Sequence, residues 1–181
     1  MNNFEFPDAL ATGLAEFLPL KPIKKSPRLY QYPIEGPVIE MKKKILLAED
    51  NLADVELVRI SVNEVGKPVD LIHVGDGGDM IEYLSSLLLQ ENLSTVGIAA
   101  ILLDLNMHRV SGIDVLKYIN LHPKLKKIPV IVFTTSSSKS DINLCYDLGA
   151  KAFVCKPLDI FEFNDTIKAI MDFWVGINML N

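Results

Sequence analysis

From Lys44 onward, short runs of consecutive apolar residues alternate with longer segments in which apolar residues recur at helical spacing. Each short run is rich in Val, Ile, Leu or Phe and has few polar interruptions, as expected of parallel strands buried on both faces. The runs predicted as strands are Ile45–Ala48, Val69–Val74, Ile98–Leu103, Val130–Phe133 and Ala152–Cys155. The segments predicted as helices lie near residues 52–64, 77–91, 111–121, 139–148 and 159–173.

Local signals at the ends of these segments support the helices. Asp76, Ser111 and Ser140 stand where side-chain N-caps are expected, and Gly66 and Gly149 mark helix ends. Strict alternation of strand and helix predicts an α/β fold with a doubly wound parallel sheet covered by helices on both faces. In such a sheet a ligand site lies beyond the carboxyl ends of the strands.

Composition narrows the class of protein. A length of 181 residues suits one domain with a sizeable core. The net charge of −5 does not favour a nucleic-acid surface, and no DNA-binding domain is expected. The longest uncharged stretch, residues 92–103, is well short of the ~20 residues of a membrane helix. Two cysteines are too few for a disulfide framework, so we predict a cytoplasmic protein.

Residues 1–40 differ from the rest of the chain, because they hold six of its ten prolines and no sustained apolar periodicity. Proline at this density predicts a largely irregular arm before a domain over residues 41–181. Met41 precedes three lysines and the first strand, so translation starting there is one interpretation. An arm that docks on a partner is the other.

Polar side chains follow four of the predicted strands, at the point where each strand ends. The first strand is followed by Glu49 and Asp50, and the third by Asp104 and, two residues on, Asn106. Thr134 follows the fourth strand and Lys156 the fifth. Any one of these residues alone would be an ordinary cap or a solvated turn residue, but all of them fall at the same edge of the sheet.

Three carboxylates at one edge repel one another unless a positive charge neutralises them. Mg²⁺, which takes carboxylate and phosphate oxygens, would do so, and Lys156 would add a second positive charge suited to a phosphate oxygen. A carboxylate can itself attack phosphorus to form an aspartyl phosphate. The set of residues therefore indicates phosphoryl transfer, in which positioning and charge stabilisation do most of the work.

Residues 42–174 resemble the receiver domain of bacterial two-component response regulators. The resemblance rests on Glu49-Asp50 after the first strand, Leu103-Asp104 after the third, Thr134 after the fourth and Lys156-Pro157 after the fifth. It implies a flavodoxin-like fold with strand order 2-1-3-4-5. It also implies a signalling protein that catalyses only its own phosphorylation and dephosphorylation, rather than an enzyme with another substrate.

The resemblance assigns a role to each matching residue. Asp104 corresponds to the phosphoacceptor, and Glu49, Asp50, Asp104 and the backbone carbonyl of Asn106 to the Mg²⁺ ligands. Thr134 corresponds to the switch hydroxyl, Lys156 to the phosphate-pairing lysine and Phe153 to the switch aromatic residue. The Lys156–Pro157 peptide bond is expected to be cis, which proline permits at low cost.

Some positions depart from the family pattern. His108 stands where most relatives have proline, and Thr135 is bulkier than the usual Ala or Gly. Extra residues around 85–97 and the closing Asp172-Phe-Trp174 resemble receivers that partner phytochrome-type histidine kinases. These relatives often form homodimers, and Trp174 is read either as an interface anchor or as a core residue.

The function that follows is a single-domain response regulator. It would accept a phosphoryl group from a histidine kinase on Asp104 in a Mg²⁺-dependent reaction, and then change its partner binding or its self-association. Two alternatives stay open: a receiver-like interaction scaffold that is not phosphorylated, and a Mg²⁺-dependent aspartyl phosphatase. The second normally carries its Asp-x-Asp motif after the first strand, whereas here Asp104-Leu-Asn106 follows the third.

Overall fold

Five parallel strands form one sheet in the order β2-β1-β3-β4-β5 in the computed structural model, which describes residues 42–89 and 97–177. This order and the parallel pairing confirm the predicted fold class. The prediction of an irregular arm falls on residues outside these ranges. The strands are β1 (Lys43–Ala48), β2 (Val69–Val74), β3 (Ile98–Leu103), β4 (Val130–Thr134) and β5 (Ala152–Cys155).

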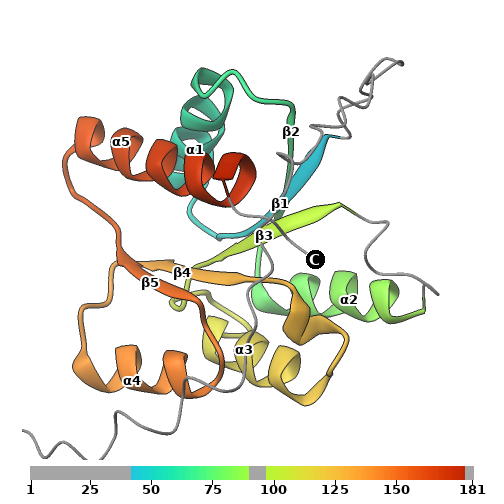
Figure 1. Ribbon diagram of the computed structural model, residues 1–181. Coiled ribbons are helices and arrows are strands. Elements are labelled where there is room, and N and C mark those ends of the chain that lie inside the picture. The colour runs from blue at the N-terminus through green and yellow to red at the C-terminus, as the bar shows by residue number, and fades with distance from the viewer. Residues whose placement is uncertain (1–41, 90–96, 178–181) are drawn as a thin grey trace, which may run out of the picture. The chain divides into compact units, whose positions relative to one another are not determined.

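Helices cover both faces of the sheet, with α1 and α5 on one face and α2, α3 and α4 on the other (Figure 1). Each helix connects two parallel strands, except α5, which follows the last strand. The bounds are α1 (Leu52–Glu64), α2 (Gly77–Leu88), α3 (Gly112–Leu121), α4 (Lys139–Asp147) and α5 (Ile160–Met171), with a 3₁₀ turn η3 (Leu125–Lys127) and a π-helical segment η4 (Asp172–Ile177).

The central strands are buried on both faces because successive side chains point to opposite sides of the sheet. In β3, Ile101 and Leu103 pack with the buried residues of α2 and α3, whereas Ala100 and Leu102 pack with those of α1 and α5. This double burial explains why the strand reads as one continuous apolar run. It also holds the carboxyl end of β3, and so Asp104, between two packed layers.

The helix starts agree with the sequence signals except at α4. The Asp76 and Ser111 side chains accept hydrogen bonds from the first-turn N–H groups of α2 and α3, as predicted. The predicted cap Ser140 is wrong, because α4 already begins at Lys139, with Ser138 at the N-cap position. A run of serines offers several equivalent caps, so composition alone cannot choose among them.

The C-terminal segment continues the last helix further than the sequence indicated. η4 follows α5 directly, and Trp174 in it is half-buried against the α1–α5 layer, which favours the core interpretation of this residue. Lys43 Nζ donates a hydrogen bond to the Val175 carbonyl at 2.8 Å. No helix within residues 42–89 or 97–177 has the length and apolar character needed to span a membrane.

Candidate functional site

The polar residues predicted at the strand ends do meet at the carboxyl edge of the sheet. Glu49 follows β1, Asp104 follows β3, Thr134 ends β4 and Lys156 follows β5. All four are buried, although each is polar or charged. Buried charges at this density require partners, which the structure supplies mainly within the group itself.

Glu49, Asp50 and Asp104 form an acidic triad. One carboxylate oxygen from each residue lies within 4.8 Å of the other two. Asp50 is the most exposed of the three, so the triad opens to solvent on its side. Carboxylate oxygens at this spacing are the ligand set of a hard divalent cation, and the triad has the composition of a divalent-cation site.

Lys156 is the positive charge opposite the triad. Its ammonium donates hydrogen bonds to Glu49 Oε2 at 2.6 Å, to Asp54 Oδ2 at 2.9 Å and to Asp104 Oδ2 at 3.2 Å. These three bonds use all three N–H groups of the ammonium. The side chain is only 4% exposed, so water contributes little to its stabilisation.

Burial and the neighbouring charges shift the pKa values of Glu49 and Lys156 in opposite directions. Burial raises the pKa of Glu49 to about 6, which outweighs the lowering effect of its hydrogen bond and charge interaction with Lys156. Burial lowers the pKa of Lys156, but hydrogen bonds to Glu49 and Asp54 raise it more, so the amine stays protonated. At neutral pH the pocket therefore carries more negative charge than Lys156 alone balances, and a cation would relieve the excess.

Asn106 and Thr134 border the phosphoacceptor candidate. The Asn106 backbone N–H donates to Asp104 Oδ1 at 3.2 Å, and its side-chain amide lies 3.5 Å from the Thr134 hydroxyl. Phe153 is half-buried on β5 and packs against the layer formed by α2, α3 and α4, away from the acidic triad. The predicted switch hydroxyl, Thr134, therefore lies near Asp104, whereas the predicted switch aromatic residue, Phe153, lies on the neighbouring strand β5.

The expectation of a cis Lys156–Pro157 bond is wrong. All peptide bonds in the part of the chain that the structure describes are trans, this one included. The trans form is favoured by about 0.5–1 kcal/mol even before proline. Lys156 reaches Glu49 and Asp104 with this bond in the trans form.

Asp54 is a site residue that the sequence interpretation missed. It stands in the first turn of α1, three residues after the N-cap Asn51, and from there it reaches Lys156. The available signal was its position, because a side chain in the first helical turn points back toward the N-terminal end of the helix. That end of α1 lies at the carboxyl edge of the sheet.

The loop between β3 and α3 contacts both the acidic triad and the start of α2. His108 contacts Asp50 through both its backbone N–H, at 3.0 Å from Oδ2, and its ring Nδ1. The next residue, Arg109, pairs with Asp76 and with Asp79 at the start of α2. The departure from the family pattern at position 108 thus places an imidazole directly on a candidate metal ligand.

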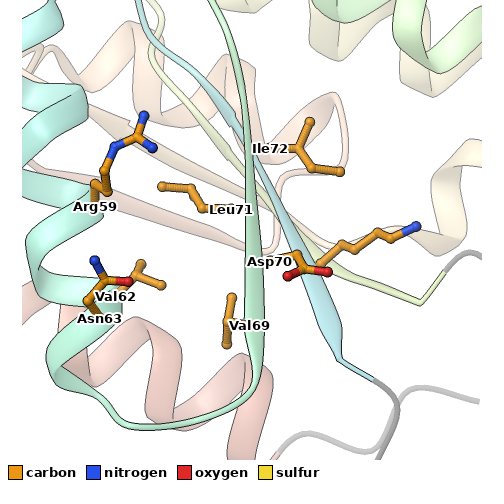
Figure 2. Close-up of a pocket in the computed structure, with 8 residues that line it drawn as sticks. Arg59, Val62, Asn63, Val69, Asp70, Leu71 and Ile72 are labelled. Atoms are coloured by element: carbon orange, nitrogen blue, oxygen red, sulfur yellow. The ribbon is translucent and has the colours of Figure 1, made fainter.

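A separate cavity of about 470 Å³ lies between α1 and β2. Figure 2 shows its lining side chains, which come from the second half of α1, from the edge strand β2 and, with Lys44, from β1. None of the residues at the strand ends lines it, so it is distinct from the acidic triad. Its lining residues are Lys44, Arg59, Val62, Asn63, Val69, Asp70, Leu71 and Ile72.

Comparison with known proteins identifies the family. The model of the response regulator receiver domain matches residues 45–168, and this range is well over half of the chain. The chain belongs to this family. It is therefore a signalling protein of two-component type rather than an enzyme, and its acidic triad is the divalent-cation site that such receivers carry.

The receiver is similar to regulators associated with phytochromes. It is 33% identical to the response regulator Rcp1 of Synechocystis sp., over 74% of this chain and 89% of Rcp1. The phosphorylated cyanobacterial phytochrome response regulator RcpA superposes with a TM-score of 0.67 at 33% identity, covering 77% of this chain and 98% of RcpA. The Mn²⁺-bound form of Rcp1 superposes with a TM-score of 0.66 at 31% identity, covering 77% and 99%.

Proposed function

We propose that this receiver accepts a phosphoryl group on Asp104 from a histidine kinase, in a reaction that depends on Mg²⁺. The observation that carries the proposal is the buried contact between Lys156 and Asp104 beside the acidic triad. A relative of this chain has been crystallised in its phosphorylated form and another with Mn²⁺, which supports both parts of the proposal. The resemblance to phytochrome regulators favours a phytochrome-type kinase, and we retain the cytoplasm as the expected location.

Each site residue has a task in this proposal. Glu49, Asp50, Asp104 and the Asn106 carbonyl would hold the ion, which when bound neutralises carboxylate charge and polarises the phosphoryl oxygens. One oxygen of Asp104 attacks phosphorus as the bond to the histidine nitrogen breaks, and the freed imidazole leaves with its electron pair. Lys156 then pairs with a phosphate oxygen as a fixed positive charge.

Phosphorylation would then bias the receiver toward a second conformation. The phosphate adds charge and acceptor oxygens next to the buried Thr134 hydroxyl, which can turn from Asn106 toward them. A shift of Thr134 frees space next to β5, into which Phe153 can turn. The surface of α4, β5 and α5 changes as a result, and with it partner binding or self-association.

Labelling with acetyl phosphate tests the proposal directly. We expect the wild-type chain to gain one phosphoryl group in Mg²⁺ and none in EDTA, measured by intact-protein mass spectrometry. Asp104→Asn should remove the label completely, because an amide oxygen is a far weaker nucleophile than a carboxylate. Asp165→Asn, at an exposed position on α5, is the matched control and should label like wild type. A label that survives Asp104→Asn would refute the proposal, and no label in wild type would leave the scaffold alternative.

Exposed apolar side chains beside the site suit a kinase contact. Leu52 at the start of α1 is 75% exposed, Leu158 just before α5 is 99% exposed and Phe161 in the first turn of α5 is 80% exposed. Both helices start at the carboxyl edge and pack on the same face of the sheet (Figure 1). Any protein that presents a phosphohistidine to Asp104 must cover this rim, and apolar groups there would gain by burial.

The substitution Phe161→Asp should separate kinase docking from phosphoryl chemistry. We expect at least a tenfold slower transfer from a phosphorylated phytochrome-type kinase, because a charge replaces an apolar contact. Labelling by acetyl phosphate should stay unchanged, since the Phe161 side chain is 80% exposed and belongs to none of the residues assigned a task in the reaction. Equal transfer rates from the kinase for the variant and the wild type would rule out this rim as the docking surface.

A further inference from the structure

We propose that His108 is an additional ligand of the cation site and gives it a preference for transition-metal ions over Mg²⁺. This inference rests on the proposed function, because it assumes that the acidic triad binds a divalent cation. It extends that function by adding a nitrogen donor to a site otherwise built from oxygens. The juxtaposition that carries it is the imidazole of His108 on the carboxylate of Asp50.

Two contacts hold His108 at this carboxylate. The backbone N–H donates to Asp50 Oδ2 at 3.0 Å, and ring Nδ1 meets the same oxygen. The loop itself is anchored on the far side by Arg109, which pairs with the buried Asp76. The backbone contact of His108 and the ion pair of Arg109 therefore hold the imidazole beside Asp50.

These two groups are near enough to become two ligands of one ion. Neighbouring ligands of an octahedral cation with bonds of ~2.1 Å lie about 3 Å apart, which is the length of an ordinary hydrogen bond. The imidazole Nδ1 and the carboxylate oxygen of Asp50 are in closer contact than this, so the exposed ring would have to turn slightly outward to leave room for an ion. Because the ring is exposed, both atoms could bind one cation after a small movement of the ring.

The ring also has freedom to complete the coordination. The His108 side chain is 91% exposed, so no packed neighbour opposes its rotation toward Glu49 and Asp104. Asp50 is the more open side of the triad, and the imidazole lies on that side. From that side the ring would supply a ligand in place of a water molecule.

Imidazole changes which ion such a site prefers. Mg²⁺ favours oxygen ligands and keeps its waters, whereas imidazole suits Ni²⁺, Cu²⁺ and Zn²⁺. Loss of one supporting group at a metal site commonly lowers affinity by about 10–100-fold. We therefore expect His108→Ala to lower Zn²⁺ affinity by about tenfold or more and to change Mg²⁺ affinity much less.

Electron spin echo spectroscopy of bound Mn²⁺ gives the decisive readout. The full chain loaded with Mn²⁺ should show the ¹⁴N coupling of a coordinated imidazole, and His108→Ala should lose it. His122→Ala is the matched control, since that ring instead contacts the Tyr118 carbonyl, and it should keep the coupling. Calorimetric titrations with Mn²⁺, Zn²⁺ and Mg²⁺ on the same three proteins supply the affinity ratios.

The outcomes separate this inference from the proposed function. If wild type binds Mg²⁺ and labels on Asp104 but shows no ¹⁴N coupling and an unchanged ion preference in His108→Ala, the inference is overturned and the proposed function stands. A coupling that survives His108→Ala or disappears in His122→Ala would also overturn it. If wild type neither binds Mg²⁺ nor labels, the proposed function fails, and this inference fails with it.

Discussion

Replacing Lys156 with methionine is expected to destabilise the metal-free protein by about 3 kcal/mol, the cost of leaving a buried charge without its partner. The substitution removes the ammonium that donates to Glu49, Asp54 and Asp104, and keeps a similar side-chain volume. Urea denaturation in EDTA at pH 7.5 measures the loss. Lys151→Met is the control, because that lysine is exposed and should tolerate the change.

The same variant should respond more strongly than wild type to Mg²⁺ and to acid. Without the competing ammonium the triad attracts a cation more strongly, so added Mg²⁺ should restore more stability.

Glu49 already has its pKa raised to about 6 by burial, and loss of Lys156 raises it further. A raised carboxyl pKa favours folding below about pH 4.5 and loses that contribution as pH rises past the folded pKa, so stability should recover toward pH 5. A Lys156→Met protein as stable as wild type in EDTA at pH 7.5 would contradict the electrostatic argument.

Gly112→Ala is expected to destabilise the fold by about 1–3 kcal/mol and to slow labelling of Asp104 by roughly 100-fold. A Cβ at position 112 would collide with the backbone carbonyl of Asp104 and lie 2.9 Å from the Leu105 Cα. Helix α3 begins at Gly112, so the helix would have to move away from the phosphoacceptor or push its backbone aside. Both effects follow from a clash with backbone atoms, which cannot move as a side chain can.

Gly75→Ala provides the matched comparison for this prediction. The added Cβ there would meet only the Asp79 side chain, at 3.9 Å, which is ordinary van der Waals contact. Thermal unfolding and the rate of acetyl phosphate labelling should therefore change little in Gly75→Ala. Similar behaviour of the two alanine variants would show that close packing at Gly112 is not what positions Asp104.

The strands and the main site residues were predictable from the sequence for one physical reason. Parallel strands buried on both faces stand out as apolar runs, and the residue after each run falls at the carboxyl edge. This rule brought Glu49, Asp104, Thr134 and Lys156 together before any coordinates were known. β1 begins earlier than predicted, because Lys43 pairs with Val69 in the sheet although it lies outside the apolar run.

Contacts that depend on the direction in which a side chain points could not be predicted from the sequence. Nothing in the apolar pattern distinguishes Asp54 from any other polar residue in a first helical turn, yet it is a partner of the buried Lys156. His108 was recognisable as a departure from the family, but its contact with Asp50 depends on the course of the loop. The trans Lys156–Pro157 bond likewise could not be read from a residue pair that permits both isomers.

The crystal structure of the receiver with Mg²⁺ and beryllofluoride, a phosphoryl mimic, would test the central claim most directly. We expect beryllium on an oxygen of Asp104, the ion among Glu49, Asp50 and Asp104, and Lys156 within hydrogen-bond distance of a fluoride. The 3.2 Å contact between Lys156 Nζ and Asp104 Oδ2 would then be replaced by the contact with fluoride. A complex in which Asp104 stays unmodified, or in which Lys156 remains bonded only to Glu49 and Asp54, would contradict it.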